Sequence, residues 1–375
     1  MTCQIRASVY VNVYLHLKEV RKIKRLFLKA ISIFLIAACV LSISSCNASS
    51  PKKYTEYYLD YFDTATTVIG YAESEEEFCS VTDIVRETLD RYHKFYDIYN
   101  SYEGITNLAD INSLHGGVHK THSVSSEIID LLKYSKEMYN LTYGEVNIAM
   151  GSVLSLWHTA REDALSNPEA AEVPDAYLLE SAAEHTNIDD VVIDEDNMTV
   201  FLADPEMTLD VGAIAKGFVA EKIAMELADR GITGFILNLG GNIRVLGKKP
   251  DGSDWIAGIT DPDAPDSDNY KAYVSLCDKA LVTSGSYQRF YYVADTSYHH
   301  IIDKDTLYPL SYFKSVTVLC NDSGLADALS TALFNMSYTD GAALIETIEG
   351  AEAMWIYSDG KTAYSSGFES CICNN

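Results

Sequence analysis

The chain has 375 residues, of which 47% are hydrophobic and 22% are charged, and it holds neither a long low-complexity tract nor a fixed-period repeat. These values exclude a disordered chain and a solenoid, and the length suits one large globular domain or two small ones. The formal net charge of −26 excludes a nucleic-acid-binding protein, because an acidic surface repels phosphate backbones.

Residues 1–56 have the order of an export signal followed by a tether. The basic stretch RKIKR at 21–25 precedes the apolar run AISIFLIAACVLSIS, which is too short to span a membrane comfortably. The sequence ISSC that ends at Cys46 resembles a bacterial lipobox. We therefore expect a lipoprotein-type signal peptide at 1–45, lipidation of Cys46 and a tether at 46–56. The alternative is an ordinary signal peptide or an uncleaved anchor, with Cys46 incidental.

Removal of residues 1–45 would leave 21 Lys and Arg against 53 Asp and Glu, a formal net charge of −32. The predicted exported part is therefore even more acidic than the whole chain. This strengthens the exclusion of nucleic acid as a partner.

The first half of the exported part predicts a strand, several helices and a hairpin. YYLDYFDTATTVIGY at 57–71 alternates aromatic, β-branched and polar residues, as a half-buried strand does. Apolar residues recur at helical spacing in three segments, 81–99, 126–141 and 150–161. The Ala- and Glu-rich stretch 163–190 is also helical in composition, and VVIDEDNMTVFLAD at 191–204 predicts a hairpin.

The second half continues with one strong helix and a series of strands. GFVAEKIAMELADRG predicts a helix at 217–231, closed by Gly231. A second apolar helix opens at Ala326. Strands are predicted within 234–247, 255–262, 271–285 and 315–320. Because helices and strands mix without strict alternation, the expected class is α+β, and without a Pro- or Gly-rich linker we expect one catalytic domain at 57–375.

The densest candidate site is DVGAIAKG at 210–217, in which Asp210 and Lys216 flank a Gly- and Ala-rich approach to a helix. Small residues let the backbone approach a ligand, and a lysine can meet a phosphate as a point charge. The order is not that of a Walker A loop. The alternative is a tight strand-to-helix turn with a solvated lysine. NLGGN at 238–242 adds a second bend, although such bends are common in hairpins.

Two further segments carry groups suited to proton transfer and to metal binding. YHHIID at 298–303 contains two imidazoles, and a histidine can take a proton from a hydroxyl near neutral pH. The alternative is an ordinary surface or core histidine pair. ADALST at 326–331 puts Asp327 and Thr331 on one helix face, and these hard oxygen ligands suit Mg2+. The alternative there is a helix start with an ordinary cap.

Taken in order along residues 57–340, these segments resemble the ApbE family of FAD:protein FMN transferases. The blocks that carry the resemblance are FDTATT, NLADIN, GEVNIAMGSVLSLW, LDVGAIAKGF, NLGGNIRVLG, WIAGITDP, SGSYQRF, YHHIID and ADALST. The resemblance implies a single two-lobed α+β domain, with mixed sheets and flanking helices, that binds FAD as a substrate. It also implies Mg2+-dependent transfer of FMN to a threonine or serine hydroxyl of a flavoprotein, with release of AMP.

The resemblance implies roles for individual residues. The expected catalytic residues are Lys216, Asp327 and His300, the last as the base that acts on the acceptor hydroxyl. The expected FAD contacts are Phe62, Tyr102, Asn147, Asp210, Lys216 and Ile301. The expected Mg2+ ligands are Ala213 through its carbonyl group, Asp327, Ser330 through its backbone, and Thr331.

Three features depart from the family pattern. Lys304 and Leu307 stand where many members have proline and glycine after HHIID. Asn147 stands where many members have aspartate, and FDTATT replaces the commoner MGT type of opening. These departures concern the flavin side and leave the metal and pyrophosphate elements intact.

The implied partners are FAD and an acceptor flavoprotein with an FMN-binding domain, either a subunit of a membrane redox complex or an exported flavoprotein. With a lipid anchor, the expected location is the outer side of the cytoplasmic membrane. Two other functions stay open: a Mg2+-dependent FAD pyrophosphatase that gives FMN and AMP, and an FAD-binding lipoprotein. Storage of FAD requires neither a metal nor a base, so Asp327, Thr331 and His300 argue against the second.

Overall fold

The computed structural model describes residues 50–267 and 269–373. The predicted signal peptide at 1–45 and the predicted lipidation site Cys46 lie outside the described residues. Residues Pro51–Asn375 form one compact unit. In the part of the chain that the structure describes, no helix combines the length and the apolar character that crossing a membrane requires.

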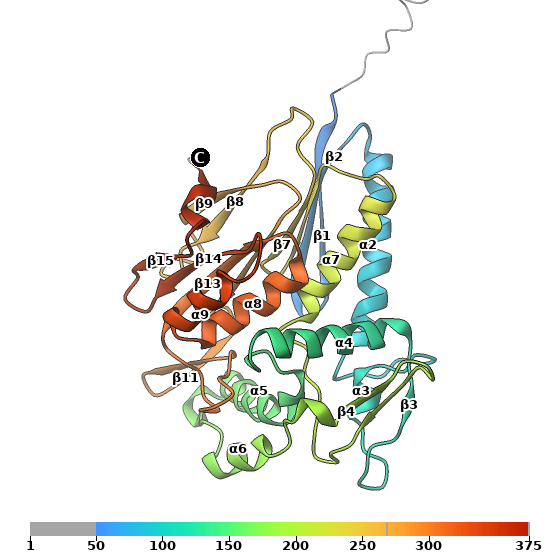
Figure 1. Cartoon of the computed structure of the whole chain (residues 1–375), viewed down its shortest axis with the longest axis vertical. Helices are drawn as coiled ribbons and strands as arrows, with labels where there is room; N and C mark the ends of the chain where they lie inside the picture. Colours follow the sequence, from blue (N-terminus) through green and yellow to red (C-terminus); the bar gives the residue numbers. More distant parts are fainter. Residues whose placement is uncertain (1–49, 268, 374–375) are drawn as a thin grey trace, which may run out of the picture. The chain divides into compact units, whose positions relative to one another are not determined.

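A sheet of eight strands runs through this unit, and each neighbouring pair in it is antiparallel (Figure 1). In sheet order its strands are β1 (Lys52–Tyr61), β2 (Thr64–Ala72), β6 (Phe235–Leu239), β7 (Asn242–Leu246), β10 (Ala280–Gly285), β13 (Phe313–Cys320), β14 (Glu352–Tyr357) and β15 (Thr362–Tyr364). Strand β13 is buried along almost its whole length, because both faces of the sheet are covered.

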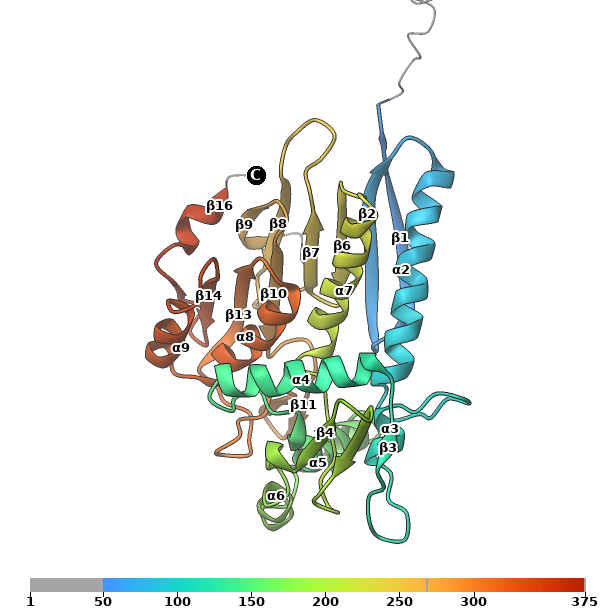
Figure 2. The ribbon, with the colours of Figure 1, turned by 45° about the vertical axis from the view of Figure 1, so that its right-hand side comes forward.

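Helices cover one face of the sheet in strand order: α2 packs on β1 and β2, α7 on β6 and β7, α8 on β10 and β13, and α9 on β14 (Figures 1 and 2). The helices are α2 (Glu75–Tyr96), α3 (Leu108–Asn112), α4 (Ser126–Leu141), α5 (Gly151–Ser166), α6 (Ala176–Ala183), α7 (Ala215–Asp229), α8 (Ser323–Asn335) and α9 (Tyr338–Ile345). Short 3-10 turns occur at Ile148–Met150, Pro168–Ala170, Ile188–Asp190 and Phe368–Cys371.

A small sheet covers the other face. Its strands are β8 (Trp255–Thr260), β9 (Tyr270–Leu276) and β16 (Ile372–Cys373). Successive residues of a strand point to opposite faces, and Val245 and Leu246 of β7 accordingly belong to different apolar clusters. Val245 packs with Trp255 and Val274 of the small sheet, whereas Leu246 faces the helices. The core is therefore split into two layers by the central sheet.

The remaining elements gather at one end of the sheet, in the lower part of Figure 1. They include the sheet β3 (His122–Ser123), β5 (Thr199–Leu202) and β4 (Val191–Asp194), and the hairpin β11 (Phe290–Val293) and β12 (Thr296–His299). Helices α5 and α6 and strand β11 share an apolar cluster around Trp157. This mixture of helices and largely antiparallel sheets confirms the predicted α+β class.

The predicted strand at 57–71 is wrong as a single element. The segment contains the end of β1, a turn at Phe62 and Asp63, and most of β2. Phe62 and Asp63 have φ angles of 54° and 49°, in the left-handed region. Two-residue hairpin turns of this kind normally contain Asn or Gly. Because neither is present here, the alternating pattern of the flanking residues continues through the turn and gives no sign of it.

Several predicted helix boundaries also shift. Helix α2 begins at Glu75 because the Ser74 side chain accepts a hydrogen bond from the Glu77 N–H. Helix α5 extends to Ser166, and the helical stretch expected at 163–190 is interrupted before α6, in a segment that contains Pro168 and Pro174. The segment 271–285 contains two strands, β9 and β10. The helix predicted at 126–141 and the hairpin predicted at 191–204 are confirmed.

Helices α7 and α8 pack directly against each other at Gly217. A Cβ atom there would lie 2.3 Å from the Ser323 carbonyl oxygen and 2.4 Å from the Asp327 Cβ. The Gly217 N–H donates a hydrogen bond of 2.8 Å to Asp327 Oδ2. The helices can reach this separation only because residue 217 has no side chain.

We expect Gly217→Ala to lower the free energy of unfolding by about 1–3 kcal/mol, because the added methyl group overpacks the contact between the helices. Urea unfolding followed by circular dichroism measures the change. Met225→Ala on the exposed side of α7 (Met225 is 54% exposed) is the control, and its effect should stay within about 0.5 kcal/mol. Equal unfolding midpoints for Gly217→Ala and the wild type would contradict the close-packing argument.

Candidate active site

A cavity of about 760 Å³ lies between the end of the central sheet, helix α5 and the hairpin of β11 and β12. This volume lies in the upper part of the range for small-molecule sites, about 300–1,000 Å³. The predicted site residues that line it are Phe62, Tyr102, Asn147, Asp210, Ala213, Lys216, His300, Ile301, Asp327 and Thr331. Ser330 is not among the lining residues: it is buried, and its hydroxyl group donates to the Asp327 carbonyl oxygen at 3.0 Å.

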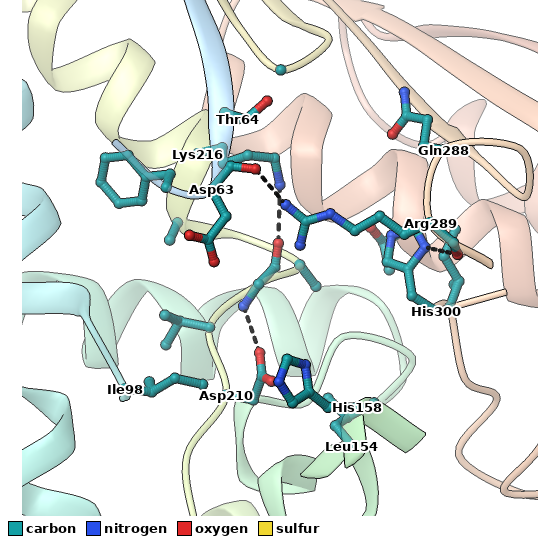
Figure 3. Close-up of a pocket in the computed structure, with 18 of the residues that line it drawn as sticks. Asp63, Thr64, Ile98, Leu154, His158, Asp210, Lys216, Gln288, Arg289 and His300 are labelled. Carbon is teal, nitrogen blue, oxygen red and sulfur yellow. Dashed lines mark hydrogen bonds between the residues drawn. The ribbon is translucent and has the colours of Figure 1, made fainter. Parts of the chain in front are cut away.

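Asp210 and Lys216 lie on the segment that leads into α7 (Figure 3). The Gly212 N–H donates to Asp210 Oδ1 at 2.8 Å, and Lys216 Nζ donates to the Gly212 carbonyl oxygen at 3.1 Å. Burial raises the pKa of Asp210, although the Gly212 N–H and nearby positive charges oppose this. Among the described residues no carboxylate oxygen lies within 4.0 Å of Lys216 Nζ, so its charge is available to an anion.

Asp327 lies in the second turn of α8, which begins at Ser323 with Asp322 as its cap. The predicted start of this helix at Ala326 is therefore wrong by three residues. Asp327 is only 4% exposed, and burial raises the pKa of its carboxyl group, partly opposed by the charge of Lys216. No basic side chain lies within 4.0 Å of it in the described part of the chain. A buried carboxylate without a basic partner favours a bound cation.

The donor groups around Asp327 fit a magnesium ion. Thr331, one turn further along α8, and Ala213 line the same cavity. Within residues 50–267 and 269–373, no three or more His, Cys, Asp or Glu side chains are arranged to hold a metal ion. A magnesium site would therefore use one carboxylate, hydroxyl and carbonyl oxygens, and oxygens from water and substrate. Mg2+ commonly binds in this way, with one or two carboxylates and with water and phosphate oxygens as its other ligands.

His300 follows the end of β12, and its ring is open to the cavity (Figure 3). Its backbone N–H donates to the Arg289 carbonyl oxygen at 3.1 Å, and its ring Nδ1 lies 3.2 Å from the same oxygen. This geometry assigns the proton to Nδ1 and leaves Nε2 as an acceptor. The surrounding protein, and to a lesser extent the Arg289 guanidinium, lower the pKa of His300 to about 3.

His299 differs from its neighbour, because its side chain is 7% exposed and has a structural role. Its Nε2 lies 2.8 Å from the Leu310 carbonyl oxygen, and its Nδ1 accepts the Ile301 N–H at 3.3 Å. With both ring nitrogens engaged, His299 holds the chain at Ile301. Only His300 of the pair has a ring nitrogen free for chemistry.

Two predicted FAD contacts already hold structural hydrogen bonds. Asn147 Nδ2 donates to the Thr186 carbonyl oxygen at 2.8 Å, and Asn147 Oδ1 accepts the Ala149 N–H at 2.9 Å. An aspartate could not make the first bond, which accounts for the amide at this position. The Tyr102 hydroxyl donates to Asp97 Oδ2 at 2.8 Å, and burial together with this carboxylate raises the pKa of Tyr102 to about 12.

Several cavity residues were not predicted from the sequence. Asn242, Ser284 and Arg289 line the cavity; the first lies in NLGGN and the other two lie in SGSYQRF. Arg289 Nη2 donates to the carbonyl oxygen of Asp63 at 2.9 Å, across 226 positions of sequence. A local sequence pattern gives no sign of a contact between residues this far apart. The sequence motifs could therefore be recognised, but the contribution of these side chains to the cavity could not be predicted.

Comparisons with known proteins give a consistent result. The ApbE family model matches residues 62–355. An FAD:protein FMN transferase of Klebsiella pneumoniae (strain 342) is 28% identical over 274 residues, 73% of this chain and 82% of that protein. One of Treponema pallidum (strain Nichols) is 34% identical over 238 residues, 60% of this chain and 64% of that protein. The crystal structure of the ApbE protein of Thermotoga maritima MSB8 superposes with a TM-score of 0.74 at 26% identity, covering 86% of this chain and all of that one.

We expect His300 and His185 to titrate on opposite sides of the ordinary histidine pKa of 6.5. Desolvation by the protein around the cavity lowers the pKa of His300, so its ring stays neutral as the pH falls from 7 to 5. A hydrogen bond to Asp204 raises the pKa of His185, so this ring gains its proton at higher pH. Histidine-selective 15N NMR, assigned with His300→Gln and His185→Gln, measures both midpoints. A His300 midpoint at or above that of His185 would overturn the expectation.

Proposed function

This chain belongs to the ApbE family, and on this basis we propose that it is an FAD:protein FMN transferase, which moves FMN from FAD to a target protein. The observation that carries the proposal is one cavity lined by the buried carboxylate of Asp327, the Lys216 ammonium, which donates to a main-chain carbonyl group, and the free imidazole nitrogen of His300. Phosphoryl transfer needs charge neutralisation and a well-placed nucleophile more than covalent chemistry by the protein.

We propose a threonine or serine hydroxyl of a flavoprotein as the acceptor. Its oxygen attacks the phosphorus that carries riboflavin, and a new P–O bond forms. The P–O bond to the AMP phosphate breaks, and AMP leaves with the bonding electrons. The hydroxyl proton passes to Nε2 of His300. Binding of the anionic pyrophosphate beside the neighbouring cations would raise the pKa of His300 towards the range that proton transfer requires.

Magnesium, when bound, would neutralise charge on the pyrophosphate. The proposed ligands are Asp327, Thr331 and the carbonyl oxygen of Ala213, with Ser330 assisting through its backbone. Lys216 and Asp210 are proposed to contact FAD near the helix start. The proposed contacts of the flavin or adenosine are Phe62, Tyr102, Asn147 and Ile301.

We expect the chain from residue 47 onward to label an FMN-binding acceptor domain when it is incubated with FAD and Mg2+. Intact-protein mass spectrometry should show an FMN-sized gain, in-gel flavin fluorescence should mark the acceptor, and EDTA should abolish both signals. Release of AMP and FMN without labelling would identify a pyrophosphatase instead. Unchanged FAD would identify a flavin-binding lipoprotein.

Substitutions at two residues separate the roles in this assay. Asp327→Asn keeps an oxygen that can accept the Gly217 N–H, so it should remain folded and lose Mg2+-dependent turnover, as Asp327→Ala should. His300→Ala should still bind FAD but transfer FMN about 100-fold more slowly or worse, because the general base is gone. Normal transfer by either variant would remove that residue from its proposed role.

We also propose that a lipid on Cys46 anchors the protein to the membrane, on the outer side of the cytoplasmic membrane. The support is sequence alone: the basic stretch, the apolar run and ISSC. The acceptor would then be a subunit of a membrane redox complex or an exported flavoprotein.

Cys46→Ser should abolish lipid incorporation in cells fed labelled palmitate, because the thiol that carries the lipid is missing. Fractionation should place the wild type with membranes. A variant that still incorporates label would show that Cys46 is not the lipidation site. Cys79→Ser, at an exposed thiol of α2, is the matched control and should change neither result.

A further inference from the structure

Three Lys and Arg side chains line the cavity, and in the described part of the chain two of them form no salt bridge with a carboxylate. Arg161 Nη2 donates to Glu162 Oε1 at 2.9 Å. Lys216 and Arg289 instead donate to main-chain carbonyl groups, at 3.1 Å and 2.9 Å. Among the described residues no carboxylate oxygen lies within 4.0 Å of either. In a chain with 54 acidic and 28 basic residues, two such cations in one cavity indicate an anionic ligand.

The Arg289 guanidinium points into the cavity between Asp63 and His300 (Figure 3). Its Nη2 makes the bond to the Asp63 carbonyl. A guanidinium carries five N–H groups in a planar fork, so donors remain for a ligand. This fork matches the spacing of phosphate oxygens better than a lysine ammonium does.

The main chain of Arg289 is fixed independently of its side chain. Arg289 lies between the end of β10 and the start of β11, where the Ser286 N–H donates to the Lys314 carbonyl oxygen at 2.9 Å. The Arg289 carbonyl oxygen accepts the backbone N–H of His300 and contacts its ring Nδ1. Arg289 therefore holds His300, the proposed base, through the Arg289 carbonyl group. The Arg289 side chain places a positive charge beside the same histidine.

We propose that Arg289 is a catalytic residue whose guanidinium binds the pyrophosphate of FAD next to His300. This inference rests on the proposed transfer of FMN from FAD. Arg289 donates hydrogen bonds to non-bridging phosphate oxygens and keeps its protons throughout. The hydroxyl proton still passes to His300, and AMP still leaves with the electrons of the broken P–O bond. The guanidinium neutralises charge on the phosphoryl group in transit and on the leaving phosphate.

The test compares three ligands that differ in their phosphates: FAD, ADP and riboflavin. Arg289→Gln should weaken FAD and ADP binding about 10- to 100-fold, because a charged hydrogen-bond donor to phosphate is lost. Its riboflavin affinity should not change, because riboflavin has no phosphate. Arg289→Lys keeps the charge but not the fork and should be intermediate. Isothermal titration calorimetry measures the affinities, and the kcat of transfer should fall about 100-fold in Arg289→Gln.

Arg230→Gln is the matched control, because it removes one positive charge at the end of α7, where Arg230 pairs with Glu226 at 2.8 Å. It should behave as the wild type. Equal losses of FAD and riboflavin affinity in Arg289→Gln would mean that Arg289 only braces the turn at Asp63, and would overturn the inference. Unchanged FAD affinity and kcat would overturn it as well. A wild type that binds riboflavin but not FAD would overturn the proposed function together with the inference.

Discussion

The contact between Gly217 and Asp327 is the constraint on which the rest of the site depends. It joins the start of α7 to the second turn of α8 across 110 positions of sequence, through a 2.8 Å hydrogen bond that forms only because residue 217 lacks a side chain. The same approach buries the Asp327 carboxylate. Lys216 precedes the contact and Thr331 follows one turn beyond it, so this single contact sets the positions of the proposed metal and phosphate groups.

The opposite wall of the cavity depends on the loop that contains Arg289. The Arg289 carbonyl oxygen holds the ring of His300, and the Arg289 side chain reaches the turn at Phe62 and Asp63. That turn has two residues in the left-handed region, which costs free energy and persists only when its surroundings hold it. The Phe62 N–H donates to His93 Nδ1 at 3.3 Å from the other side. The strained turn, the proposed base His300 and the Arg289 cation therefore lie in one small region. Strained backbone is common in active sites.

The departures from the family pattern have local physical explanations. Leu307 stands where many members have glycine and adopts a φ of 63°, a conformation that costs a leucine about 1–3 kcal/mol. The apolar cluster around Trp157 includes Leu307, and Trp157 Nε1 donates to its carbonyl oxygen at 2.9 Å, which offsets this cost. Lys304 replaces proline and lies 3.5 Å from Glu145 Oε1 at the cavity wall. In this chain, both positions are therefore held by contacts of their own.

The sequence by itself determined the elements whose pattern is local and the blocks that carry the chemistry. The helix at 126–141 and the hairpin at 191–204 follow from their periodicity, and Asp210, Lys216, His300 and Asp327 stand in recognisable motifs. Only the tertiary structure decided that Asp327 is buried, that His299 is structural while His300 faces the cavity, and that Arg289 reaches Asp63. The physical reason is that periodicity reports which face of an element is buried, whereas the approach of distant backbones depends on how whole layers pack.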